Sequence, residues 1–263
     1  MLKRKRLNVS LLIAAVLFIS LAVFMRSQYV VPILMYHSVC ENPVEGNRLA
    51  VSTDTFRRQM HFLKRHNYNI LTLEQLADLI KNKKKIPPRA VAITLDDGYR
   101  DNFDCAFPVL KEYGIPATLF LIVDEIGRPQ KDRLFWEEIF KMRDSGVIVF
   151  GSHCLGPDPL TKIKTDDGLR RQIFDSKRIL EEKLGRPVDV FSYPEGRFND
   201  KIRKMVIEAG YKTAVVTNPG KEFANDDIFA LKRLRISENA RNMFVFWVES
   251  SGYYNFMREH RHK

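Results

Sequence analysis

Beyond residue 30, short runs of apolar and β-branched residues alternate with segments in which apolar residues recur every three or four positions. The first pattern predicts buried strands, and the second predicts amphipathic helices. Regular alternation of the two is typical of an α/β fold, in which helices cover a mostly parallel sheet. The predicted strands span residues 31–36, 91–95, 117–123, 147–151, 188–193, 212–217 and 231–236.

Strict alternation of these strands with helices favours a closed or nearly closed barrel, although periodicity alone does not exclude an open sheet. The helix predicted at residues 73–80 begins with Thr72 and Gln75, which have the spacing of a capping box. Asp54 precedes the apolar positions of another helix, at residues 56–63, and is its predicted cap. Further helices are predicted at residues 102–113, 133–143, 166–184, 199–209 and 243–250.

Residues 1–6 are strongly basic, residues 7–25 are almost wholly apolar, and Arg26 ends the apolar run. This run is long enough to cross most of a bilayer core, so we expect one N-terminal transmembrane helix. The basic flank predicts a cytoplasmic N-terminus, with everything after Arg26 outside the cytoplasm. Because 20–22 could be a cleavage site, secretion after signal cleavage is the alternative. We therefore expect a basic stub and membrane anchor at 1–28 and a single domain at 29–263.

The chain has 263 residues, of which 45% are hydrophobic and 29% are charged, a composition that excludes disordered and collagen-like classes. Its formal net charge of +11 bears on partners and not on the fold. A solvated basic surface, or attraction to anionic lipid or an acidic glycan, would account for the charge. Nucleic acid is not an expected partner, because no RNP, zinc-finger or helix-turn-helix signature accompanies the basic residues.

Polar residues that can carry chemistry follow the first five predicted strands. In a parallel barrel the carboxyl ends of the strands share one mouth, so residues at those positions converge on one pocket. The residues are His37 after the first strand, Asp96 and Asp97 after the second, Asp124 after the third, His153 after the fourth, and Pro194 and Glu195 after the fifth.

Adjacent carboxylates at a strand exit can point in different directions, and Gly98 lets the backbone turn tightly after them. A carboxylate and an imidazole together can hold a divalent ion that polarises a carbonyl and lowers the pKa of bound water. The second carboxylate can then accept the proton of that water. An isolated Asp-Asp-Gly is more often only a turn, but its place after a buried strand, with His153 at another strand exit, favours the catalytic interpretation.

Several ordered motifs resemble the polysaccharide deacetylases with a NodB-type domain (carbohydrate esterase family 4), closest to the branch that acts on poly-N-acetylglucosamine. Thr94-Leu95-Asp96-Asp97-Gly98 is similar to the first family motif, and Gly151-Ser152-His153 to the opening of the second. Residues 191–196 resemble the third motif. Residues 31–37 resemble the first strand of that branch, and residues 231–236 resemble its late strand. The resemblance extends from about residue 30 to residue 254.

This resemblance implies a deformed (β/α)7 barrel and hydrolysis of N-acetyl groups on hexosamine residues of an envelope or extracellular polysaccharide. It implies that Asp96 is the general base and that Asp97 and His153 are metal ligands. It also implies a divalent metal ion, most commonly zinc but sometimes cobalt or nickel.

The strand-end residues His37, Tyr193 and Pro194 are predicted to contact the substrate. Two alternatives stay open for the first two of these residues. A histidine that ends a strand can simply hydrogen-bond neighbouring backbone. An aromatic residue beside a strand is more often part of the core.

The chain departs from the family pattern in the second motif, where Pro157 occupies the position of the second metal histidine. We hypothesise that Asp158 replaces that histidine, because carboxylate oxygens bind zinc and harder ions. The usual arginine of the third motif is also absent, and Ser192 stands in its place. Arg233, Arg235 and Arg197 are the candidates to orient Asp96 instead.

Because of Pro157, a second function remains open. The chain would then be a catalytically weakened barrel that binds envelope glycan without turnover. Retention of Asp96, Asp97 and His153 favours the enzyme.

Overall fold

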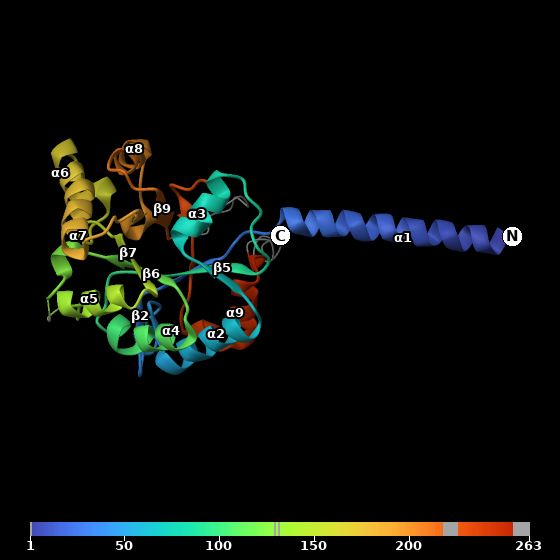
Figure 1. Ribbon diagram of the computed structural model, residues 1–263, viewed down its shortest axis with the longest axis horizontal. Coiled ribbons are helices and arrows are strands. Elements are labelled where there is room, and N and C mark those ends of the chain that lie inside the picture. Colours follow the sequence, from blue (N-terminus) through green and yellow to red (C-terminus); the bar gives the residue numbers. More distant parts are fainter. Residues whose placement is uncertain (1, 129, 131, 218–225, 255–263) are drawn as a thin grey trace.

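The computed structural model describes residues 2–128, 130, 132–217 and 226–254. Helix α1 (Leu2–Ser27) projects from one side of a compact α/β domain (Figure 1). Within the part of the chain that is described, no helix is long and apolar enough to cross a membrane. The transmembrane helix predicted for residues 7–25 is therefore not confirmed.

The domain is built on a parallel sheet in the order β10-β9-β8-β7-β6-β5-β1-β11, with β4 paired to β5 off this path. Each of the predicted strands is present. Their bounds are β1 (Ile33–Tyr36), β5 (Ala90–Leu95), β6 (Ala117–Leu121), β7 (Ile148–Ser152), β8 (Val190–Ser192), β9 (Thr213–Val216), β10 (Leu231–Lys232) and β11 (Leu234–Arg235).

The last strand segment closes the sheet into a barrel. Residues 231–232 pair with β9, whereas residues 234–235 pair with β1 at the other end of the sheet. A single residue, Arg233, separates β10 from β11, so one short stretch of chain joins the two edges. If β10 and β11 are treated as one strand, the closed path has the seven strands of the expected (β/α)7 barrel.

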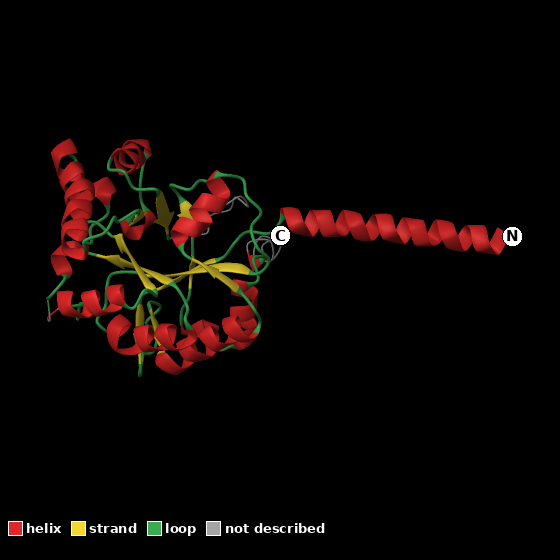
Figure 2. Ribbon diagram, viewed as in Figure 1, coloured by secondary structure: helices red, strands yellow, loops and turns green. Residues whose placement is uncertain are grey.

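Helices surround this barrel, as Figure 2 shows, and α3 covers one end of its interior with Leu73 and Leu76. The helix bounds are α2 (Thr53–Arg65), α3 (Leu73–Lys81), α4 (Phe107–Tyr113), α5 (Trp136–Asp144), α6 (Asp166–Arg170), α7 (Ser176–Leu184), α8 (Asp200–Glu208) and α9 (Met243–Ser250). Two π-helical segments, η1 (Asn102–Ala106) and η5 (Arg171–Asp175), precede α4 and α7, and short 3-10 turns include η2 (Val123–Glu125) and η6 (Pro194–Gly196).

Helix caps agree with the predictions in one case and differ in another. The capping box of Thr72 and Gln75 is present at the start of α3. Helix α2 begins one residue after Ser52, whose hydroxyl accepts a hydrogen bond from the backbone N–H of Thr55, so the prediction of Asp54 as cap is wrong. The sequence patterns also missed strand β4 (Asn69–Leu71) and the two-stranded sheet of β2 (Ser38–Cys40) and β3 (Ala50–Ser52), because the apolar runs around them are too short to show a period.

The two faces of each barrel strand have different environments, as the two-residue period of a strand requires. On β1, Leu34 and Tyr36 pack among the helices, whereas Ile33 belongs to a separate apolar cluster inside the barrel. Phe120 fills much of this interior, and a Cβ atom on Gly151 would lie 2.5 Å from its ring. The lower part of the barrel is thus apolar and closely packed.

Toward the mouth of the barrel, the inward positions become polar. On β5 the inward series runs from Ala90 and Ala92, which are apolar, to Thr94 and then Asp96. On the closing segment, Leu231 is followed two residues later by Arg233. The interior therefore changes from apolar to charged side chains at the height of Asp96 and Arg233. The candidate site lies directly above these two residues, toward the mouth of the barrel.

Candidate active site

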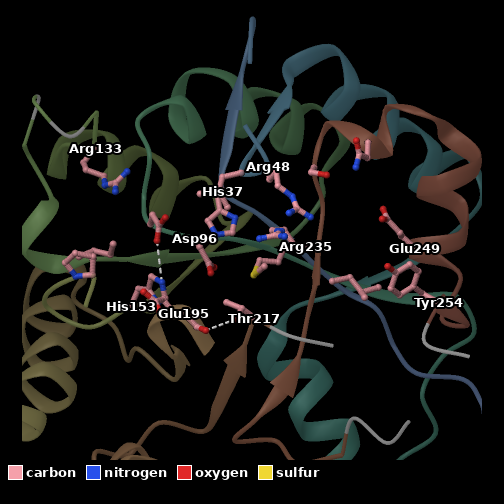
Figure 3. A pocket seen from close by; sticks show the side chains of 18 residues that line it. His37, Arg48, Asp96, Arg133, His153, Glu195, Thr217, Arg235, Glu249 and Tyr254 are labelled. Carbon is pink, nitrogen blue, oxygen red and sulfur yellow. Dashed lines mark hydrogen bonds and ion pairs between the residues drawn. The ribbon is translucent and has the colours of Figure 1, made fainter. Parts of the chain in front are cut away.

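A cavity of about 860 Å³ opens at the carboxyl ends of the barrel strands (Figure 3). Several of its residues, such as His37 and Arg235, come two residues after an inward-facing position of their strand and so face the same side. Its lining is Met35, His37, Arg48, Leu49, Asp96, Asp97, Ile122, Arg133, His153, Pro157, Glu195, Thr217, Leu234, Arg235, Ser237, Asn239, Glu249 and Tyr254.

Asp96, which directly follows β5, is held at the floor of this cavity by Arg233. The two side chains form a bidentate pair in which Nη1 donates to Oδ1 and Nη2 donates to Oδ2, both at 2.6 Å. Asp96 is 1% exposed and Arg233 is 0% exposed. Of the three arginines that the sequence offered to orient Asp96, the structure selects Arg233.

The remaining donors of Arg233 are also satisfied. Its Nη1 donates to Thr94 Oγ1 at 3.1 Å, its Nη2 donates to Ser192 Oγ at 3.0 Å, and its Nε donates to the carbonyl of Val216 at 3.1 Å. Ser192, at the position of the missing family arginine, is thus an acceptor for an arginine from another strand. The guanidinium has partners on or directly after three barrel strands, β5, β8 and β9, and is fixed in position.

The charge of Arg233 determines the protonation state of Asp96. Burial alone would raise the pKa of this carboxyl group, because it disfavours the charged form. The positive charge of Arg233 and its hydrogen bonds outweigh burial and hold the pKa of Asp96 below its ordinary value. Asp96 is therefore ionised at neutral pH, as a proton acceptor must be.

The backbone turns sharply after Asp96. Asp97 has a φ of 70° and Gly98 has a φ of 65°, so both lie in the left-handed region. A non-glycine residue is strained there, and a Cβ atom on Gly98 would also lie 2.9 Å from Leu121. This turn aims Asp97 away from Arg233 and toward His153.

Asp97 and His153 face each other across the cavity wall, with 3.4 Å between Asp97 Oδ1 and His153 Nε2. The other ring nitrogen, His153 Nδ1, lies 2.8 Å from the carbonyl oxygen of Ser192. Since a carbonyl oxygen can only accept, Nδ1 must carry the hydrogen, and the lone pair of a neutral ring is then on Nε2. Two acceptors at this distance need a cation between them, either a proton or a metal ion.

The pKa values of this pair follow from the same contact. Burial would raise the pKa of Asp97, but the hydrogen bond from His153 and the nearby charges lower it to about 2. Burial would lower the pKa of His153, but the hydrogen bond to Asp97 and the charges of both carboxylates raise it. In the absence of a metal ion, a proton on Nε2 therefore holds the pair together.

These two donors suit a divalent ion in type and orientation. A ligating histidine generally donates its second ring N–H to a carboxylate or a backbone carbonyl, as His153 does. However, the described residues contain no group of three His, Cys, Asp or Glu side chains that could hold a metal ion. Pro157 lines the cavity at the position where the family motif has a second histidine, and it offers no side-chain donor.

The structure does not bring Asp158 to the other two predicted ligands. Its side chain is 81% exposed, lies outside the cavity lining and forms an ion pair with Lys162 at 3.8 Å. Because β7 ends before this segment and the chain continues over the surface, the residue after Pro157 points to solvent. The prediction that Asp158 completes the metal site is not supported by this placement.

His37 lines the cavity, as predicted for a substrate contact. It is 8% exposed, and its Nδ1 is buried without a hydrogen-bond partner among the described residues. Burial, the largest influence, lowers the pKa of His37 despite the nearby carboxylates Asp96 and Asp97. A neutral imidazole with an unsatisfied nitrogen is thus available to a ligand.

The other two predicted substrate contacts lie elsewhere. Tyr193 is fully buried and stacks on Phe198 with 4.6 Å between ring centroids, so the core alternative describes it better. Pro194 is also buried and does not line the cavity. Its neighbour Glu195 does line it, from a left-handed position with a φ of 55°. Asp124, at the third strand end, is exposed and is not part of the lining.

Sequence reasoning missed Arg48 and Arg133. Arg48 comes from a loop whose path no periodic pattern predicts. Arg133 was predicted as the first residue of a helix, but α5 begins only at Trp136, so Arg133 lies in the segment before it. Arg133 forms a buried ion pair with Glu125 at 2.6 Å and lies over the ring of Tyr99. Arg235 was considered only as a partner for Asp96. The two-residue period from Arg233 would have placed it one step nearer the cavity mouth.

Comparison with known proteins identifies the relatives of this chain. The polysaccharide deacetylase family matches residues 83–214. YxkH of Bacillus subtilis, whose name assigns it to the same family, is 34% identical over 220 residues, which are 83% of this chain and 76% of that protein. A poly-β-1,6-N-acetyl-D-glucosamine N-deacetylase of Staphylococcus aureus is 27% identical over 206 residues, which are 74% of this chain and 71% of that enzyme.

Among solved structures, the Streptococcus pyogenes deacetylase PplD in complex with acetate is similar, with a TM-score of 0.73 and 28% identity. The match covers 83% of this chain and 98% of PplD. A polysaccharide deacetylase from Bacillus cereus has a TM-score of 0.69 and 32% identity over 82% of this chain and 67% of that structure. The family match over residues 83–214 includes the ends of β5 and β7, where Asp96, Asp97 and His153 lie.

Proposed function

Because this chain belongs to the polysaccharide deacetylase family, we propose that it is a hydrolase that removes N-acetyl groups from hexosamine residues of a cell-envelope or extracellular polysaccharide. The observation that carries the proposal is the arrangement of two adjacent carboxylates in one cavity. Asp96 is kept ionised by Arg233, and Asp97 faces His153. The relatives that act on N-acetylated sugar polymers support the same substrate class.

Asp97 and His153 are the residues that would hold a divalent ion, for which zinc is the first candidate because it accepts both carboxylate and imidazole ligands. Such an ion, when bound, supplies positive charge that polarises the acetyl carbonyl and lowers the pKa of a water molecule. Asp158 has no part in this assignment.

Asp96 accepts the proton of the attacking water. Each of its oxygens has one hydrogen bond from Arg233 and retains a lone pair, so the carboxylate can bind water while it stays positioned. When the carbon–nitrogen bond of the acetamide breaks, the proton that Asp96 holds can pass to the leaving amine. The products are acetate and a free hexosamine amino group, and Asp96 returns to its ionised form.

His37 contributes to substrate binding. Its unsatisfied Nδ1 is available to hydrogen-bond a group of the bound sugar, and its lowered pKa keeps the ring neutral at neutral pH. A ligand that hydrogen-bonds this nitrogen removes the cost of a buried polar atom without a partner.

Release of acetate from N-acetylglucosamine oligomers tests this function. We expect wild-type protein to release acetate with added zinc, chelator to abolish the release, and Asp96→Asn to reduce kcat by about 10²–10⁴-fold, the usual contribution of a general base. Release that is unaffected by chelator and by Asp96→Asn would contradict the mechanism.

A glycan-binding barrel without turnover is the second candidate, favoured because the described residues bring no third His, Cys, Asp or Glu side chain to Asp97 and His153. Tight binding of oligomers, with no acetate released at any metal concentration, would support it.

We also propose that the domain acts outside the cytoplasm, held at a membrane by α1. The basic residues 1–6 and the exposed apolar side chains of α1, such as Leu17 and Phe18, support this location. Fractionation of cells that produce the full chain tests it. The protein should remain in the membrane fraction after alkaline carbonate extraction, and its recovery in the soluble cytoplasmic fraction would contradict the proposal.

A further inference from the structure

Two arginines in the cavity have no acidic partner. Among the described residues, neither Arg48 nor Arg235 forms an ion pair or a side-chain hydrogen bond, although both line the cavity. An arginine is charged at any physiological pH and offers several N–H donors in a planar fork. Most other charged side chains of this lining do have a partner of opposite charge.

The charges of the lining can be matched in pairs. Asp96 is neutralised by Arg233, Asp97 faces His153, Glu195 pairs with Arg197 at 3.2 Å, and Arg133 pairs with Glu125. Glu249 is the remaining carboxyl group, and burial raises its pKa to about 7, so it is partly neutral at neutral pH. An excess of positive charge from Arg48 and Arg235 therefore remains in the cavity.

The strand register places Arg235 close to the reacting groups. Arg235 lies two residues beyond Arg233 on the closing segment, and so on the same inward face, about 7 Å nearer the mouth at the usual rise of a strand. It pairs in register with Met35, which precedes His37 by the same step of two. Arg235 thus lies on the mouth side of the Asp96–Arg233 pair, within the cavity lining.

Arg48 reaches the same space from the loop between β2 and β3. The backbone of its neighbour Leu49 fixes this loop, because the Leu49 carbonyl accepts from Ser38 N–H and the Leu49 N–H donates to Asn47 Oδ1, each at 3.0 Å. In the view of Figure 3, Arg48 and Arg235 lie between His37 and Asp96 on one side and Glu249 and Tyr254 on the other. Both guanidinium groups therefore line the part of the cavity beside the reaction centre.

We propose that Arg48 and Arg235 form an anion subsite and that the polysaccharide substrate carries a carboxylate or phosphate group beside the N-acetylated hexosamine. This inference rests on the proposed deacetylase function. Guanidinium groups bind carboxylates and phosphates through paired, charge-assisted hydrogen bonds. Both arginines are exposed, so an anion that enters the cavity can reach them. A volume of about 860 Å³ is near the upper end for small-molecule sites, so the cavity has room for the acetamido sugar and an adjacent charged group.

Deacetylation of matched oligosaccharides tests the subsite. The substrates are a neutral N-acetylglucosamine tetramer, a tetramer that alternates N-acetylglucosamine with glucuronate, and an N-acetylglucosamine oligomer that bears phosphate. For the wild-type protein with zinc, we expect kcat/KM for at least one anionic substrate to exceed that for the neutral tetramer by about tenfold or more, as charged hydrogen bonds allow. Comparison of the carboxylate and phosphate substrates identifies which anion is the natural one.

Single substitutions then assign this preference to residues. Arg235→Gln and Arg48→Gln should each lower the anionic-to-neutral ratio of kcat/KM several-fold, mainly through KM, and the preference should weaken as ionic strength rises. The matched control is Arg178→Gln, which removes the same charge from an exposed position of α7 outside the cavity. This control should keep the wild-type ratio.

Binding separates failure of the subsite from failure of the enzyme. Calorimetric titration of chelator-treated wild-type protein measures affinity for the same oligosaccharides without turnover. Tighter binding of an anionic oligomer that is lost in Arg235→Gln supports the subsite even if no glycan releases acetate. Equal affinity and equal kcat/KM for neutral and anionic oligomers overturn the subsite, while the deacetylase function stands.

Discussion

The two adjacent carboxylates of the site, Asp96 and Asp97, have very different surroundings. Asp96 is buried, and both of its oxygens accept from Arg233, which is itself bound by Thr94 and Ser192. Asp97 faces one imidazole at 3.4 Å, beside a cavity wall where Pro157 contributes no donor. In the base half of the site, the carboxylate that acts as base has all its partners within the chain, whereas in the metal half the described residues supply only two donors, Asp97 and His153, for a metal ion.

This difference shows that the protein fixes the base without help from a ligand, whereas the metal-binding pair needs a bound cation. Arginine does not titrate in the physiological range, so the Asp96–Arg233 pair fixes both the position and the ionised state of the base at any working pH. The Asp97–His153 pair instead depends on a shared cation, because two acceptors face each other. The rate of deacetylation should therefore be limited by the affinity of Asp97 and His153 for the metal ion.

Arg233→Met is the change that should damage the base half most. The substitution leaves the buried Asp96 carboxylate without its partner, and breaking a buried ion pair in this way usually costs about 3–5 kcal/mol. We expect a decrease of that size in the free energy of unfolding, measured by urea denaturation at pH 7. The pKa of Asp96 should also rise, because burial then acts without the opposing charge.

The matched control for this prediction is Arg235→Met, two residues further along the same segment at an exposed position. Its free energy of unfolding should change by less than about 1 kcal/mol, as is usual for surface substitutions. Equal destabilisation by the two variants would mean that the Asp96–Arg233 pair contributes no special stability.

Glu249→Gln extends the comparison to a cavity carboxyl group that forms no ion pair with any described residue. Burial raises the pKa of Glu249 to about 7, above the value near 4.3 that is usual in an unfolded chain. The folded protein thus binds more protons than the unfolded chain between these values, and wild-type stability decreases as pH rises from about 4 to about 7. A glutamine side chain at this position cannot ionise, so the stability of the variant does not decrease in this way. At pH 8 its free energy of unfolding should exceed that of wild type by about 1–3 kcal/mol.

The measurement is urea denaturation of both proteins at pH 5 and at pH 8. The stability gained by the variant should be larger at pH 8 than at pH 5. A difference between the two proteins that does not change with pH would show that Glu249 titrates at its ordinary pKa, and would contradict the prediction.

Asp158→Ala should have the smallest effect. Because Asp158 is exposed and paired only with Lys162, we expect the variant to bind the same molar ratio of zinc as wild type, measured by plasma mass spectrometry after dialysis against zinc. The free energy of unfolding should change by less than about 0.5 kcal/mol, since isolated surface pairs contribute little. A loss of bound zinc would return Asp158 to the ligand set.

Much of the fold could be predicted from the sequence because barrel strands and amphipathic helices leave long periodic patterns. Each predicted strand is present, and α9 begins and ends at the predicted residues. The strands β2, β3 and β4 were missed, because the apolar runs around them are too short to show a period. A closed or nearly closed barrel was predicted, but not the way it closes, because this depends on residues 231–235 pairing with β9 and β1 at once.

Site residues that directly follow barrel strands could be predicted from the sequence. Residues whose position depends on the path of a loop could not. Positions after β1, β5 and β7 placed His37, Asp96, Asp97 and His153 in one cavity, as the geometry of a parallel barrel requires. Asp158 was placed by proximity to Pro157 in the chain, but the loop carries it to the surface. The selection of Arg233 needed the barrel closure, which brings the closing segment beside β5.

The most direct test of the difference between the two halves is a zinc titration of acetate release by wild-type protein and Pro157→His. The variant supplies a donor where the cavity wall lacks one, and Asp158→His is the control that adds the same side chain at the neighbouring exposed position. We predict that Pro157→His reaches half-maximal activity at a zinc concentration about tenfold or more below that of wild type, as an added ligand implies. Asp158→His should behave like wild type. Identical zinc dependence of wild type and Pro157→His, with the same maximal rate, would contradict the conclusion that the metal half is incomplete.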